Sequence, residues 1–151
     1  MKFALIICTY NRPKSIVRLL VSIESQNLLP DEIIVVDGSE LKDTSLADNN
    51  FKVNLTYYHV SEADRGLTKQ RNLGLSKVSA DIDIVCFLDD DVILDPNYFQ
   101  ELIKTFELDQ ETIGVGGYIT NEINWNKNSG QRESLNGGQF YFDGYYRELP
   151  L

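Results

Sequence analysis

The chain is poor in basic residues, histidine and cysteine. Its 151 residues carry 23 acidic and 14 basic side chains, which gives a formal net charge of −9. This balance argues against a nucleic-acid partner, because nucleic-acid binding through a basic face needs an excess of Lys and Arg. A polyanionic substrate would need a local cation, since the overall field repels it. With only Cys8, Cys86 and His59 available, no zinc site of the Cys/His type can form.

Long apolar runs are also absent. The apolar run at residues 3–8 is too short for a signal peptide or a membrane-spanning helix, and no other run is long enough to span a bilayer. Both cysteines lie within apolar runs, which is typical of reduced core thiols in a reducing compartment. With 42% hydrophobic and 25% charged residues, the composition is that of a soluble globular domain of ordinary size.

Along most of the chain, short apolar runs alternate with segments whose apolar residues recur at helical spacing. Asn11 can cap a first helix that has Pro13 in its first turn, and further helices are predicted to start near Gly66 and after Pro96. The polar stretch at residues 40–50 is predicted to be a loop or a short helix. Strands are predicted at residues 3–8, 32–36, 53–60, 82–88 and 113–120. This alternation predicts an α/β fold in which helices cover both faces of a mostly parallel sheet.

The composition changes after about residue 120, where Asn, Gly and aromatic residues dominate. We therefore expect an α/β domain over residues 1–120. Residues 121–151 look like the start of a second, incomplete region, as in a chain truncated at its C-terminus. The aromatic run at residues 140–146 could stack on a sugar ring or could simply pack.

Three polar clusters follow predicted strands, at residues 9–11, 37–39 and 89–91. Ligands bind at the carboxyl ends of the strands in open parallel sheets, so these clusters predict a site. Strand alternation puts Asp89 and Asp91 on one side and Asp90 on the other. Two converging carboxylates suit Mg²⁺ or Mn²⁺, which would also supply the missing positive field. The alternative is a solvated acidic turn that caps the next helix.

Two further segments have a functional and a structural interpretation. Asp37 at a strand end could accept a hydrogen bond from a ribose hydroxyl or a base N–H, or could belong to a plain Asp-Gly turn. Residues 64–72 bring three basic side chains to a helix start, where they could bind a diphosphate or form a solvated helix face. His59, beside two tyrosines, is interpreted as structural.

In their order along the chain, the segments 6–12, 35–39, 66–72 and 87–91 resemble the motifs of family 2 glycosyltransferases, and the resemblance covers about residues 3–120. It implies a GT-A fold and a nucleotide-diphosphate sugar donor. Residues 1–120 would bind the nucleotide sugar, and residues 121–151 would begin the acceptor-binding region. The acceptor itself would be a glycan or a lipid-linked molecule.

The resemblance also implies roles for individual residues. Asp91 would ligate Mn²⁺ or Mg²⁺, with Asp89 near the ribose or a metal-bound water. Asp37 would contact the base or the ribose. The remaining nucleotide-sugar site would be formed by Thr9, Tyr10 and Asn11 around the nucleoside, by Arg71 and Asn72, and by Asp90.

Two positions depart from the family pattern. Gly38 stands where the family often has a second aspartate, and Cys8 stands where it often has proline. The family's catalytic base is an Asp or Glu well downstream of the metal motif, so it is expected beyond Leu151. No role is assigned to Glu122, Glu133 or Asp143.

The expected function is therefore metal-dependent, inverting transfer of a sugar to an acceptor hydroxyl. The expected location is the cytoplasm, including the inner face of the membrane, where the full-length protein could associate peripherally. One alternative is a module that binds a nucleotide sugar without turnover. A nucleotidyltransferase would normally carry a glycine-rich, basic phosphate loop after the first strand, and residues 9–13 do not form one.

Overall fold

The computed structural model describes residues 1–42, 46, 51–117, 140–142 and 146–148. The chain divides into two compact units, Met1–Gln100 and Glu101–Leu151. The first unit contains the sheet and the candidate site. The second contains most of helix α4 (Tyr98–Leu108) and the short antiparallel pair β5 (Phe140–Phe142) and β6 (Tyr146–Glu148).

A four-stranded sheet forms the centre of the first unit. It consists of β1 (Phe3–Thr9), β2 (Glu32–Asp37), β3 (Leu55–His59) and β4 (Ile84–Asp89), in the order β3-β2-β1-β4. All neighbouring strands are parallel, which confirms the predicted sheet. At its carboxyl edge, Thr9 pairs with Asp37 and Cys8 pairs with Asp89. The polar clusters that follow β1, β2 and β4 are therefore brought to one edge.

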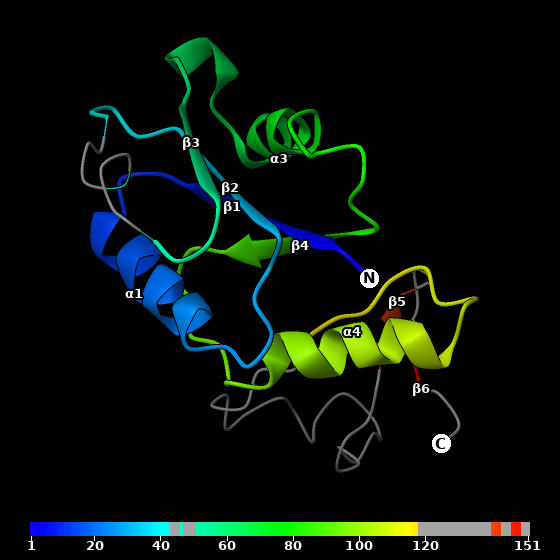
Figure 1. Ribbon diagram of the computed structural model, residues 1–151. Coiled ribbons are helices and arrows are strands. Elements are labelled where there is room, and N and C mark those ends of the chain that lie inside the picture. Colours follow the sequence, from blue (N-terminus) through cyan, green and yellow to red (C-terminus); the bar gives the residue numbers. More distant parts are fainter. Residues whose placement is uncertain (43–45, 47–50, 118–139, 143–145, 149–151) are drawn as a thin grey trace, which may run out of the picture. The chain divides into compact units, whose positions relative to one another are not determined.

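Helices cover both faces of the sheet (Figure 1). Helix α1 (Pro13–Glu24) buries one apolar face, whose residues recur at helical spacing: Ile16, Leu19, Leu20 and Ile23. Helix α3 (Leu67–Leu75) follows a short 3-10 turn, η1 (Glu62–Asp64), and lies against the other face. Gly74 makes this close approach possible, because a Cβ atom there would lie only 2.6 Å from Cγ2 of Ile6 on β1.

Three local predictions were wrong. Residues 113–117 have no regular structure, although a strand was predicted over 113–120, and residues 118–120 lie outside the described part. Glycine at positions 114, 116 and 117 costs backbone entropy and supplies no side chain to pack. Ile113 is accordingly 95% exposed. The third strand is also shorter than residues 53–60.

The third error concerns Asn11, which does not cap helix α1. The cap position belongs to Arg12, without a side-chain cap hydrogen bond. Asn11 instead adopts a left-handed conformation with φ of 52°, which Asn tolerates better than most residues. Its Oδ1 accepts a hydrogen bond from the backbone N–H of Glu40 at 3.2 Å, so Asn11 joins the turns that follow β1 and β2.

The contact between helix α3 and β1 generates a stability prediction. We expect Gly74→Ala to lower the free energy of unfolding by about 1 kcal/mol, because overpacking typically costs about 1–3 kcal/mol and the gain in helix propensity offsets about 1 kcal/mol of that cost. Urea denaturation measures the change. Gly114→Ala is the control, since its Cβ would meet nothing within 4 Å. Equal stability of the two variants would contradict the packing account.

Candidate functional site

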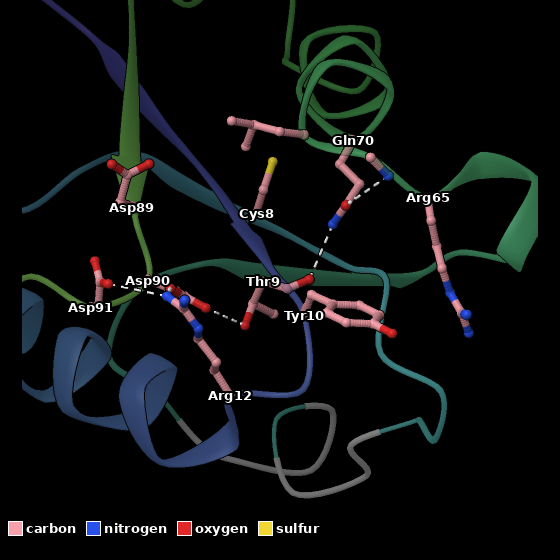
Figure 2. Close-up of a pocket in the computed structure, with 11 residues that line it drawn as sticks. Cys8, Thr9, Tyr10, Arg12, Arg65, Gln70, Asp89, Asp90 and Asp91 are labelled. Carbon is pink, nitrogen blue, oxygen red and sulfur yellow. Dashed lines mark hydrogen bonds and ion pairs between the residues drawn. The ribbon is translucent and has the colours of Figure 1, made fainter.

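A pocket of about 550 Å³ opens at the carboxyl edge of the sheet, and we call it the strand-end pocket. Figure 2 shows the acidic residues and Arg12 on one side of it, Tyr10 and Arg65 on the other, and Thr9 and Gln70 between them. The pocket is lined by Cys8, Thr9, Tyr10, Arg12, Arg65, Gly66, Leu67, Gln70, Asp89, Asp90 and Asp91.

The three aspartates alternate between exposed and buried, as predicted, although only Asp89 belongs to β4 and the other two lie in the turn that follows it. Asp90 is only 5% exposed, whereas Asp89 and Asp91 face solvent. Oδ2 of Asp90 accepts a hydrogen bond from the Thr9 hydroxyl at 2.6 Å, and Oδ1 accepts one from Nη1 of Arg12 at 3.1 Å. A buried carboxylate needs such partners to offset its desolvation. Asp90 therefore links the ends of β1 and β4, and both of its oxygens are engaged.

Arg12 also contacts the exposed Asp91. The same Nη1 atom lies 3.0 Å from Oδ2 of Asp91, so one guanidinium bridges two adjacent carboxylates. The hydrogen bond to Asp90, followed by the charges of Asp90 and Asp91, raises the pKa of Arg12 above its ordinary value. Arg12 stays charged and partly compensates the acidic end of the pocket.

Asp89 forms a separate ion pair with the helix on the other side of the pocket. Its Oδ1 lies 3.2 Å from Nη2 of Arg71, and the Arg71 guanidinium lies 5.6 Å from the centre of the Phe87 ring. Asp89 and Asp91 are both more than half exposed, so each retains carboxylate surface for a ligand. Among the residues that the structure describes, no cluster of three or more His, Cys, Asp or Glu side chains could hold a metal. The donor set fits a hard cation that shares its coordination with water and phosphate oxygens.

The opposite end of the pocket combines an aromatic ring with a cation. Tyr10 is 47% exposed, and the guanidinium carbon of Arg65 lies 5.7 Å from the centre of its ring. Nη2 of Arg65 makes one long hydrogen bond, 3.4 Å, to the Ser39 carbonyl oxygen. Nε of Arg65 is buried without a hydrogen-bond partner. This end offers a flat surface and N–H donors.

Asp37 belongs to a second pocket of about 530 Å³. Thr9 and Arg12 line both pockets. Asp37 is 1% exposed, and its two oxygens accept hydrogen bonds from Ser39 N–H at 2.7 Å and the Tyr57 hydroxyl at 2.6 Å. Asn11 also lines this second pocket.

The structure thus divides the predicted site residues between two adjoining pockets. Five of them line the strand-end pocket, namely Thr9, Tyr10, Asp89, Asp90 and Asp91. Arg71 reaches this group through its ion pair, whereas Asn72 is exposed on α3 and lines neither pocket. The functional roles of these residues stay predictions.

Three lining residues, Arg12, Arg65 and Gln70, were not among the individually predicted site residues, although Arg65 belongs to the basic segment at residues 64–72. All three fall within the segments that carry the family resemblance or directly beside them. The only feature of the sequence that could have pointed to Arg12 and Arg65 is their positive charge in an acidic chain. No feature of the sequence pointed to Gln70. Their partners are 26 to 79 residues away in sequence, apart from one contact of Gln70 to Gly66.

Comparison with known proteins identifies the class to which this fold and site belong. The family model described as glycosyl transferase family 2 matches residues 4–150, and the chain belongs to this family. It is 29% identical over 122 residues to a glucosyl-dolichyl phosphate glucuronosyltransferase of Haloferax volcanii, which covers 79% of this chain and 38% of that protein. It is also 32% identical over 107 residues to the O-antigen chain rhamnosyltransferase RfbN of Salmonella typhimurium. This match covers 70% of this chain and 33% of that protein.

Solved structures of S. aureus TarS share the fold. Residues 1–349 of TarS match with a TM-score of 0.63 and 27% identity, covering 73% of this chain and 33% of that one. The complex of TarS with UDP matches with a TM-score of 0.62 and 28% identity, and this match also covers 73% of this chain and 33% of that one. These matches confirm the GT-A fold. The chain spans about a third of the length of these relatives.

None of the helices that the structure describes is both long and apolar enough to cross a membrane.

The thiols generate a reactivity prediction. Cys8 lines the strand-end pocket and Cys86 is buried, and both are free. Burial raises the pKa of each thiol to about 11. Because the thiolate is the reactive form, only about 0.1% of each thiol is reactive at pH 8.

We therefore expect iodoacetamide to modify the folded protein very slowly at pH 8. The rate should rise about tenfold with each pH unit toward 11, as the thiolate fraction rises. Intact-mass spectrometry measures the rate, and the protein unfolded in urea is the control. Modification of folded and unfolded protein at equal rates would contradict the effect of burial.

Proposed function

We propose that this chain is the donor-binding part of a glycosyltransferase that moves a sugar from a nucleotide diphosphate to an acceptor hydroxyl. The observation that carries the proposal is the pocket at the carboxyl edge of the sheet, with two exposed carboxylates at one end and Tyr10 and Arg65 at the other. The structural relative TarS has been solved with UDP and with UDP-GlcNAc, which supports a nucleotide-sugar donor.

In this proposal the diphosphate lies at the acidic end and the nucleoside extends toward Tyr10. Mg²⁺ or Mn²⁺ held by Asp89 and Asp91 would supply the positive charge that stabilises the departing diphosphate. Arg12 keeps its hydrogen bond to the buried Asp90 while Asp91 serves the cation. The exposed ring of Tyr10 offers a surface on which a base can stack.

The reaction would invert the anomeric carbon. A carboxylate base takes the proton of the acceptor hydroxyl, whose oxygen attacks the sugar while the bond to the diphosphate breaks. In this proposal Asp89 and Asp91 hold the cation and both oxygens of the buried Asp90 are bonded, so we place the base outside the described residues. Glu122, Glu133 and Asp143 also lie outside them.

We propose a glycan or a lipid-linked molecule as the acceptor. The names of two relatives, which refer to dolichyl phosphate and to the O-antigen chain, support this class. The cytoplasmic location and peripheral association with the inner face of the membrane stay predictions from the family resemblance.

A binding module without turnover is the second candidate, because the chain spans only about a third of its relatives. Incubation with nucleotide sugars, with and without an acceptor extract, separates the two functions. A glycosyltransferase releases free nucleotide diphosphate in the presence of the acceptor extract, whereas a binding module leaves the donor intact.

The proposed metal site generates the next prediction. We expect Asp91→Asn to weaken Mn²⁺-dependent binding of a nucleotide diphosphate by about tenfold or more, since removing a charged binding partner costs about 1.5–3 kcal/mol. Isothermal titration against UDP, GDP, dTDP, CDP and ADP, with Mn²⁺ and with EDTA, measures the affinity.

Asp81→Asn is the matched control. It removes the same charge from an aspartate that precedes β4 and pairs with Lys2, away from the pocket lining. We expect it to bind like the wild type. Equal Mn²⁺-dependent affinities of Asp91→Asn and the wild type would exclude Asp91 as a metal ligand.

A further inference from the structure

Gln70 is a buried side chain between the two ends of the strand-end pocket, and every polar atom of its amide is bonded. It is 5% exposed. Its Nε2 donates to the carbonyl oxygens of Thr9 at 3.1 Å and Val36 at 2.8 Å, and its Oε1 accepts from the backbone N–H of Gly66 at 3.3 Å. Figure 2 shows the side chain reaching from α3 toward Thr9.

The two carbonyl groups lie where the first two strands end. Thr9 is the last residue of β1, and Val36 precedes the last residue of β2. Buried carbonyl groups must find donors, and a single amide here supplies one to each strand. The contact with Gly66 adds the start of α3. One side chain therefore connects three segments that are 27 to 57 residues apart in sequence.

Gly38 leaves the space that Gln70 occupies. A Cβ atom at position 38 would lie 3.2 Å from Oε1 of Gln70 and 3.3 Å from Cγ of Arg65. The backbone of Gly38 adds a second hydrogen bond to the Thr9 carbonyl, at 3.0 Å. A side chain at position 38 would therefore crowd both Gln70 and Arg65.

The Thr9 carbonyl belongs to the peptide that leads into Tyr10, and the Thr9 hydroxyl donates to Asp90. Asp90 in turn accepts from Arg12. An amide that fixes this peptide therefore acts on both ends of the pocket. We propose that Gln70 is a positioning residue, which holds Tyr10 and the Thr9–Asp90–Arg12 group in the arrangement that receives the nucleotide diphosphate. This inference rests on the proposed function.

The test replaces Gln70 by methionine, which has a similar length but no donors. Titration with UDP, GDP, dTDP, CDP and ADP in Mn²⁺ is done well below the lowest unfolding midpoint, so that every variant is folded. We expect Gln70→Met to weaken binding of the preferred nucleotide by about tenfold or more, as small displacements of binding groups are costly. Ser76→Ala, which loses a side-chain hydrogen bond to the Leu73 carbonyl at the far end of α3, should bind like the wild type.

A purely structural role would lower the unfolding midpoint of Gln70→Met and leave its dissociation constant unchanged, and that result overturns the inference. If Gln70→Met does not fold, the positioning role is tested with Gly38→Ala, because this variant keeps Gln70 but crowds its Oε1. We expect Gly38→Ala to bind about threefold more weakly or worse, and unchanged affinity overturns the inference. If the wild type binds none of the five nucleotides, the proposed function fails and the inference fails with it.

Discussion

The hydrogen bond between the Thr9 hydroxyl and the buried carboxylate of Asp90 is the interaction on which the arrangement of the pocket depends. Burying a carboxylate at a strand end is costly unless its oxygens are paired, so Thr9 and Arg12 must lie where they do. The pairing ties the end of β1 to the end of β4. Asp89, the last residue of β4, and Asp91, in the turn that follows it, are both exposed, whereas Asp90 between them is buried.

The distribution of charge follows from the same arrangement. In a chain of net charge −9, three arginines gather at one edge of the sheet, and two of them pair with the acidic triplet. Low-dielectric surroundings strengthen such local fields, while distant surface charges are screened. An anionic ligand therefore meets cationic groups and hydrogen-bond donors at this edge, although the protein as a whole repels it.

Much of the fold could be predicted from the sequence, because a strand buried on both faces reads as a continuous apolar run. The positions of β1 and β2 follow from that pattern, whereas β4, predicted from the same pattern, is an edge strand whose residues alternate in burial. Gln70 and Arg12 could not be predicted, since their partners lie far away in sequence and no local periodicity reports them. The predicted strand was wrong over residues 113–117, where three glycines supply no side chains to pack.

His59 offers a way to follow the end of β2. It is the only histidine in the chain, and its Nε2 lies 2.8 Å from the carbonyl oxygen of Ser39, which lines the second pocket. Because a carbonyl can only accept, the neutral imidazole carries its hydrogen on Nε2, which fixes the tautomer. The pair of imidazole resonances in the NMR spectrum should therefore shift with any ligand that moves this turn. Labelling of histidine alone is enough, and the assignment is unambiguous because the chain has one histidine.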